Sequence, residues 1–155
     1  MMAIKATEQE QRQAVLDEAA LWLRTPYHHR AIIKGVGADC MTLLIACYGI
    51  VGLAPKIEAM PQYTYQYGLH DGDDVYLDHL LKYSREVPEP QPADVVVYKV
   101  ARLWSHCGIV VKWPTIIHAQ VGEGVRYAEG NKAPLAFQRN GKGRPIKFLS
   151  PWAEG

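Results

Sequence analysis

The sequence predicts an α+β fold in which helices come first and a curved antiparallel sheet of about five strands follows. Apolar residues recur at helical spacing in the first half, over residues 7–24 and 40–50. After Pro92, runs rich in β-branched residues are separated by short turns that contain glycine or proline. Short strands joined in this way are typical of a curved antiparallel sheet. The 155 residues suit one domain, 1–155, with a substantial core.

Three helices are expected before the sheet. Thr7 is a suitable N-cap for the first, and Pro26 ends it because the residue before a proline is pushed out of the helical region. Its apolar stripe consists of Val15, Leu16, Ala19, Trp22 and Leu23. The second helix begins at Cys40 and stops near Gly52. Residues 55–75 read as irregular, and a short helix is expected over 75–83.

The strands follow from the second half of the chain. Each is a short β-branched or aromatic segment between turn residues. They are expected at 94–100, 106–111, 115–119, 125–127 and 146–148.

Composition excludes several classes of function. The net charge of +1 gives no basic surface for nucleic acid, and the apolar stretches are far too short to cross a membrane. The first residues contain no apolar segment of the kind that a secretory signal needs. We therefore expect synthesis in the cytoplasm, with delivery as part of a larger assembly as the alternative.

Cys40 is the most informative residue of the chain. A glycine-rich turn, Gly35-Val36-Gly37-Ala38-Asp39, delivers it to the start of an apolar helix. A helix N-terminus carries partial positive charge and unpaired N–H groups, so it favours a thiolate. Such a thiolate is a nucleophile with amide donors beside it for a developing oxyanion.

The other cysteines are expected only to pack. Cys40 and Cys47 are seven residues apart on one helix, a rise of roughly 10 Å that is too long for a disulfide. With Cys107 the number of cysteines is odd, so all three are predicted to be reduced. A zinc site fails because no C-x₂₋₄-C pair exists. The acidic residues Asp71, Asp73, Asp74 and Asp78 lack the spacing of a calcium loop.

Two of the six histidines stand out by their place in the predicted sheet. His106 opens one strand, and His118 ends the next. In a hairpin that turns near Trp113, the two lie seven and five residues from the turn. An offset of two keeps both side chains on one face, because strand side chains alternate, while Cys107 points to the other face. The other histidines, His28, His29, His70 and His79, are read as ordinary polar residues.

These residues carry a resemblance to the NlpC/P60 family of papain-like cysteine peptidases, and most to its phage-associated members. The matching pieces occur in the family's order over roughly residues 20–130. They are Tyr27, Asp39-Cys40, the segment 92–98 (PADVVVY), the segment 106–111 (HCGIVV) and the segment 116–119 (IIHA). The chain departs from the family pattern at Met41 and Thr42, where Ser and Gly are common, and at Ala93, where Gly is common.

The resemblance implies a papain-like NlpC/P60 fold and a catalytic trio. Cys40 is the implied nucleophile, His106 the base and His118 the third polar residue that orients it. Tyr27 and Asp39 are assigned to the oxyanion and substrate side, where Asp39 also supports the helix start through its charge. No metal or organic cofactor is expected.

The implied substrate is the stem peptide of peptidoglycan, cleaved between D-glutamate and a diamino acid. Phage tail proteins are the expected partners in a phage or prophage setting. Two alternatives stay open. The same three residues support acyl transfer to an amine or alcohol, and the fold also suits a tail or cell-wall binding module with little or no activity.

Overall fold

Over residues 5–54 and 75–153, which the computed structural model describes, the centre of the protein is a six-stranded antiparallel sheet. The strand order is β3-β8-β4-β5-β6-β7, so β4 to β7 form the expected meander. The bounds are β3 Arg85–Val87, β4 Val95–Val100, β5 Leu103–Lys112, β6 Thr115–Gln120, β7 Gly124–Glu129 and β8 Ile146–Ser150. A separate pair, β1 (Ile32–Ile33) and β2 (Gly37–Ala38), precedes the second helix.

The edge of the sheet differs from the expectation of a simple meander. The last strand, β8, does not follow β7 but returns to pair with β4, where Val97 faces Lys147. No residue pattern marks β3, which has only three residues and, among the described strands, pairs only with β8. Both features depend on a partner far away in the chain, so local residue pattern does not reveal them.

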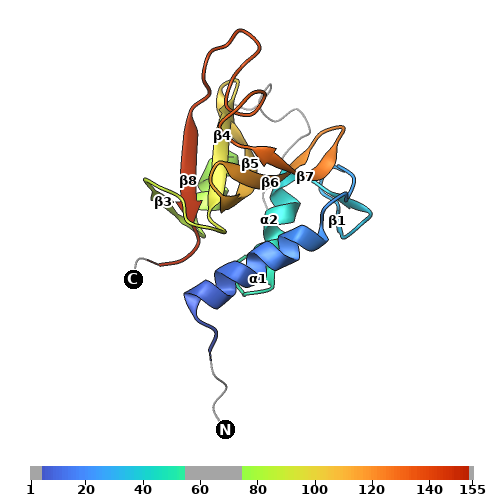
Figure 1. Cartoon of the computed structure of the whole chain (residues 1–155), viewed down its shortest axis with the longest axis vertical. Coiled ribbons are helices and arrows are strands. Elements are labelled where there is room, and N and C mark those ends of the chain that lie inside the picture. The colour runs from blue at the N-terminus through green and yellow to red at the C-terminus, as the bar shows by residue number, and fades with distance from the viewer. Residues whose placement is uncertain (1–4, 55–74, 154–155) are drawn as a thin grey trace.

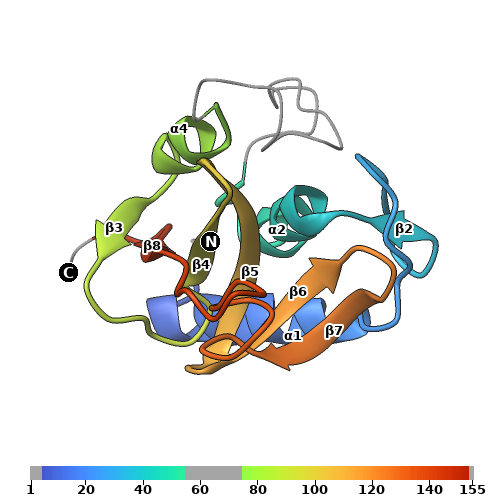
Figure 2. The same cartoon turned by 90° about the horizontal axis from the view of Figure 1, so that it is seen from above.

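The helices lie where the sequence predicts them, but two are shorter than expected. The helices are α1 Glu8–Leu21, α2 Cys40–Gly49 and α4 Val75–Leu81, and α4 ends at Leu81 and not at residue 83. Thr7 caps α1 by accepting a hydrogen bond from the Glu10 amide at 3.1 Å. Helix α1 ends at Leu21, before the expected residue 24, and Arg24 already has a φ of +71°. Figures 1 and 2 show α1 and α2 on the same side of the sheet.

Two apolar layers hold these elements together. The larger layer fills the space between the helices and the sheet, and its sheet side includes Val95, Val97, Cys107, Ile109 and Ile117. The smaller layer lies on the opposite face and consists of Val96, Tyr98, Val110, Ile116 and Leu135. The alternation along β4 and β5 therefore assigns neighbouring residues to opposite faces, as period two requires.

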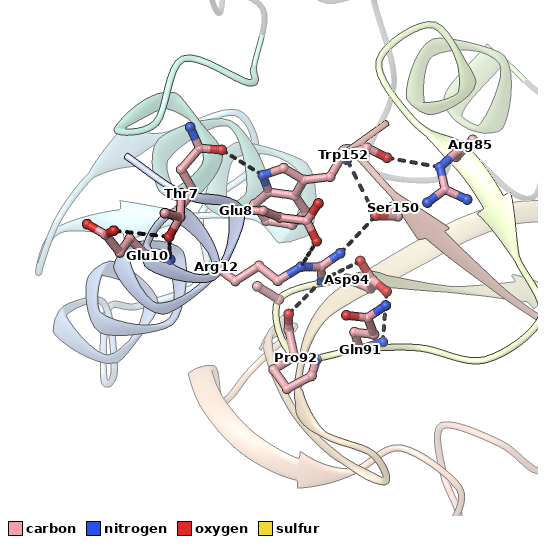
Figure 3. Close-up of polar contacts among 12 residues, drawn as sticks. Thr7, Glu8, Glu10, Arg12, Arg85, Gln91, Pro92, Asp94, Ser150 and Trp152 are labelled. Atoms are coloured by element: carbon pink, nitrogen blue, oxygen red, sulfur yellow. Dashed lines mark hydrogen bonds and ion pairs between the residues drawn. The ribbon is translucent and has the colours of Figure 1, made fainter. Parts of the chain in front are cut away.

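A buried ion pair joins α1 to the sheet and to the end of the chain (Figure 3). Arg12 Nη1 lies 2.9 Å from Asp94 Oδ1, and Arg12 Nη2 donates to the Ser150 hydroxyl at 3.3 Å. The guanidinium of Arg12 also lies 4.2 Å from the ring centroid of Trp152, whose indole N–H donates to Gln11. The segment after β8 is thus docked on α1 of the same chain.

Ala93 occupies a backbone conformation that favours glycine. Its φ is +73°, and its side chain is fully buried just before β4. A left-handed conformation costs a residue with a Cβ about 1–2 kcal/mol, part of which glycine loses again through its greater freedom when unfolded. We therefore expect Ala93→Gly to raise the free energy of unfolding by up to about 1 kcal/mol, measured by urea denaturation. A lower stability of the glycine variant would contradict this account.

Some of the sequence expectations lie outside the described residues. They are the irregular stretch 55–74 together with His70, Asp71, Asp73 and Asp74. Among the helices that the structure does describe, none has both the length and the apolar character to cross a membrane.

Candidate active site

Cys40 is the first residue of α2, and Asp39 caps this helix. The Asp39 carboxylate accepts hydrogen bonds from the amides of Met41 and Thr42 at 3.0 and 2.8 Å. In return the Thr42 hydroxyl accepts from the Asp39 amide at 2.8 Å, which completes a capping box. Thr42, a departure from the family pattern, therefore stabilises the helix start. The amide of Cys40 lies outside this cap and at the positive end of α2.

The chain before Cys40 is held by short-range contacts. Tyr27 forms a backbone bridge with Ala38, which places it beside the approach to Cys40, and its side chain packs on the larger core layer. The second oxygen of the Asp39 carboxylate accepts from the Arg30 amide at 2.7 Å and lies 3.8 Å from His29 Nδ1. The Asp39 carboxylate is thus buried, and both of its oxygens accept backbone hydrogen bonds that hold this turn in place.

His106 and His118 meet as the hairpin pattern predicts. In the β5–β6 ladder Ile109 pairs with Ile117, and continuing this register places Gly108 opposite His118. A Cβ on Gly108 would lie 3.1 Å from the His118 Cβ, so glycine leaves room for the ring. His106 is two residues further along, on the same face, and its Nε2 lies 2.8 Å from His118 Nδ1. The predicted offset of two residues is confirmed.

The sheet opens where α2 approaches it. The β5–β6 ladder ends at the pair Ile109–Ile117, although β5 continues back to Leu103 in its pairing with β4. Helix α2 packs against both β5 and β6 at this point. Cys40 Sγ lies 4.0 Å from the carbonyl oxygen of Ser105, the residue before His106. The parting of the two strands therefore brings the sulfur to the end of β5 that carries the histidine.

The surroundings of Cys40 favour its thiolate. A hydrogen bond from the Cys107 side chain is the largest influence that lowers the pKa of Cys40, and the hydrogen bond and charge of His106 add to it. Burial and the Asp39 carboxylate act in the opposite direction, but the pKa of Cys40 still lies well below its usual value. Burial raises the pKa of Cys47, so that side chain remains a thiol. Of these two, only Cys40 has the electrostatics of a nucleophile.

His118 is held neutral. Burial, followed by the charges of His106 and Arg126, lowers its pKa to about 3. A neutral ring whose Nδ1 faces His106 can accept a hydrogen bond from a protonated His106. This is the electronic role that an orienting residue needs.

The buried neutral state of His118 predicts an acid-sensitive fold. The pKa of His118 in the unfolded chain is about 6.5. Below that pH the unfolded state is protonated at His118, whereas the native state takes up this proton only near pH 3. The free energy of unfolding should therefore fall as the pH decreases from 6 to 4, by about 1 kcal/mol per pH unit more than in His118→Gln. Urea denaturation of both proteins over this range measures the difference. Parallel pH profiles would contradict the assignment.

The structure adds two contacts that the sequence did not reveal. Tyr76, in α4, lies with its hydroxyl 2.9 Å from Cys40 Sγ, and Cys107 Sγ lies 3.3 Å from the carbonyl oxygen of Cys40. Cys107 does point to the opposite face of β5 from His106, as predicted, but that face meets the start of α2. No local pattern marks Tyr76, because its contact depends on how α4 packs.

Comparison with solved structures identifies the architecture. No protein-family model and no curated protein matches the sequence. The structure superposes on NlpC1 from Trichomonas vaginalis with a TM-score of 0.61, at 16% identity over 93% of this chain and 44% of that one. Rv1477, a hypothetical invasion protein of Mycobacterium tuberculosis, gives 0.61 at 18% identity, covering 96% of this chain and 65% of that one. The NlpC/p60 domain of the peptidoglycan hydrolase SagA gives 0.56 at 17% identity, covering 88% and 96%.

The chain has the NlpC/P60 fold. It spans 44% and 65% of the first two proteins but almost all of the isolated SagA domain, so the likeness concerns one domain of those longer chains. Within the NlpC/P60 fold of this chain, the start of α2 and the β5–β6 hairpin bring together Cys40, His106 and His118, the three residues that the sequence singled out.

Proposed function

We propose that this chain, as one domain over residues 1–155, is a cysteine peptidase that cleaves peptide bonds in peptidoglycan. The observation that carries the proposal is the Cys40 sulfur at the positive end of α2, beside a His106–His118 pair joined at 2.8 Å. The low pKa of Cys40 and the neutral state of His118 support a thiolate–imidazolium pair.

In this mechanism His106 accepts the thiol proton and the Cys40 thiolate attacks an amide carbonyl. Because Nε2 of His106 is engaged by His118, Nδ1 is the nitrogen left to exchange protons at Cys40. The new carbon–sulfur bond leaves an oxyanion, which the Cys40 amide and the Tyr27 hydroxyl stabilise. Protonated His106 then gives its proton to the leaving amine as the carbon–nitrogen bond breaks. Water, deprotonated by His106, hydrolyses the thioester and restores the thiolate.

The substrate is proposed from the likeness to the NlpC/p60 domain of SagA, a peptidoglycan hydrolase. Among the similar structures are forms of RipA mutated at a cysteine, a histidine and a glutamate. In RipA the histidine and the glutamate are 12 positions apart, the separation of His106 and His118. This spacing supports His118 as the counterpart of the third polar residue. The bond between D-glutamate and a diamino acid is the proposed site of cleavage.

The test is incubation of purified peptidoglycan fragments with the native protein and with Cys40→Ala, followed by mass spectrometry. We expect new amine and carboxylate termini with the native protein only. Cleavage that persists in Cys40→Ala would overturn the mechanism. Fragment binding without cleavage by either protein would favour the wall-binding module, and transfer of the acyl group to an added amine would favour the acyltransferase. The phage-associated setting stays a prediction, which the neighbouring genes would test.

A further inference from the structure

The sulfur of Cys40 touches a hydroxyl that the mechanism above does not use. Tyr76 Oη lies 2.9 Å from Cys40 Sγ and 2.9 Å from Cys107 Sγ. Cys107 Sγ in turn lies 3.3 Å from the Cys40 carbonyl oxygen. All three side chains are buried, with Cys40 only 7% exposed. In such surroundings a hydrogen bond to a charged atom is strong, because water does not compete for it.

Which of these three side chains donates a hydrogen bond depends on which of them is protonated. Burial and the nearby sulfur atoms raise the pKa of Tyr76, and burial together with Cys40 raises that of Cys107. Both groups therefore keep their protons while Cys40 ionises. The single O–H of Tyr76 can then point at the thiolate, and the S–H of Cys107 can point at the thiolate, at Tyr76 Oη or at the Cys40 carbonyl.

We propose that Tyr76 is a further catalytic residue whose hydroxyl donates a hydrogen bond to the Cys40 thiolate, and that Cys107 is a positioning residue that orients this hydroxyl. The inference rests on the proposed function in so far as Cys40 is its nucleophile. Helices α2 and α4 both pack against β5, so the strand that carries His106 also sets the distance between Tyr76 and the sulfur (Figure 2). The thiolate thus has three hydrogen-bonding neighbours, His106 and Cys107 from β5 and Tyr76 from α4.

This arrangement has a consequence for the reaction. A donor to sulfur stabilises the resting thiolate, and the hydrogen bond weakens when the negative charge moves to the carbonyl oxygen during attack. It strengthens again when the thioester breaks and the thiolate leaves. Tyr76 therefore extends activity to lower pH and assists the departure of Cys40, at some loss of nucleophilic strength.

The experiment measures the pKa of Cys40 in the full chain from the pH dependence of its alkylation by iodoacetamide, with the modified cysteine identified by mass spectrometry. Tyr76→Phe keeps the ring and removes only the hydroxyl. A hydrogen bond to a charged group corresponds to roughly one to two pH units, and we expect the alkylation midpoint to rise by that amount. Tyr48→Phe is the matched control, since its buried hydroxyl donates to the Ala93 carbonyl instead, and should leave the midpoint unchanged.

Two Cys107 variants test the positioning role. Cys107→Ala should also raise the midpoint, because the Cys107 hydrogen bond lowers the pKa of Cys40, and Cys107→Ser, which keeps a donor, should raise the midpoint by less than Cys107→Ala does. If Cys107 also orients the Tyr76 hydroxyl, adding Cys107→Ala to Tyr76→Phe should raise the midpoint by less than Cys107→Ala does in the native protein. A midpoint unmoved by Tyr76→Phe, with native circular dichroism and melting temperature, would overturn the proposal, as would an ordinary thiol pKa for Cys40 in the native chain. The alkylation experiment contains no substrate. A midpoint that shifts as expected in a protein that does not cleave peptidoglycan would therefore contradict the proposed substrate and leave the role of Tyr76 standing.

Discussion

Replacing His106 by alanine is expected to lower the rate of peptide cleavage by about 10²- to 10⁴-fold. His106 is both the proton acceptor of Cys40 and the proton donor to the leaving amine in the proposed mechanism. Its hydrogen bond and charge also lower the pKa of Cys40, so the variant should need a higher pH for alkylation. Cleavage of peptidoglycan fragments and the pH dependence of alkylation measure the two effects separately.

A second buried histidine provides the control. His79, in α4, is 5% exposed and packs against the ring of Tyr83, and among residues 5–54 and 75–153 its Nε2 has no hydrogen-bond partner. His79→Ala should leave the alkylation midpoint of Cys40 in place and the cleavage rate within a few-fold of native. Equal losses in both variants would mean that His106 acts through the fold and not as the base.

The largest effect on stability is expected at Asp94. Its carboxylate is the buried partner of Arg12, and the side chains of the two residues are 2% and 4% exposed. Asp94→Ala leaves the buried guanidinium without its buried counter-charge, with only the exposed Glu8 carboxylate remaining, and loss of a buried partner costs about 3–5 kcal/mol. It also removes the acceptor for the Gln91 amide, 2.8 Å away, at the entry to β4. Urea denaturation should show a loss in this range, together with loosening of the docked segment at Trp152.

The same arginine supplies an internal control for this prediction. Arg12 Nε also contacts Glu8 at 2.9 Å, but the Glu8 side chain is 41% exposed. Exposed ion pairs contribute about 0–1 kcal/mol, so Glu8→Ala should be nearly neutral. If Glu8→Ala and Asp94→Ala destabilised the protein equally, burial would not be the deciding factor.

Much of the fold could be predicted from the sequence because its signals are local. The cap at Thr7, the helix start at Asp39 and the β-branched runs of β4 to β6 depend on residues a few positions apart. The contact between His106 and His118 also follows from local structure. The position of the hairpin turn sets which residues of the two strands face each other, and the alternation of side chains sets which face each one occupies. The register with Gly108 opposite His118 agrees with that reasoning.

The elements that were missed depend on distant partners. Strand β3 is recognisable only by its pairing with β8, and β8 reaches β4 after a long excursion from β7. Nothing in the sequence singles out Arg12, because its partners Asp94 and Ser150 are 82 and 138 residues away. Tyr76 could not be selected among nine tyrosines without the position of α4.

The sequence by itself determined which side chains form the proposed site: a cysteine at a helix start, and two histidines placed on one face by a single hairpin. Helix caps and strand alternation are short-range effects that survive without tertiary context. The tertiary structure alone decided what surrounds the sulfur. The parting of β5 from β6 sets the approach of His106, and α4 brings the Tyr76 hydroxyl to Cys40. These contacts join segments far apart in the chain, whose relative positions are set by the burial of both apolar layers.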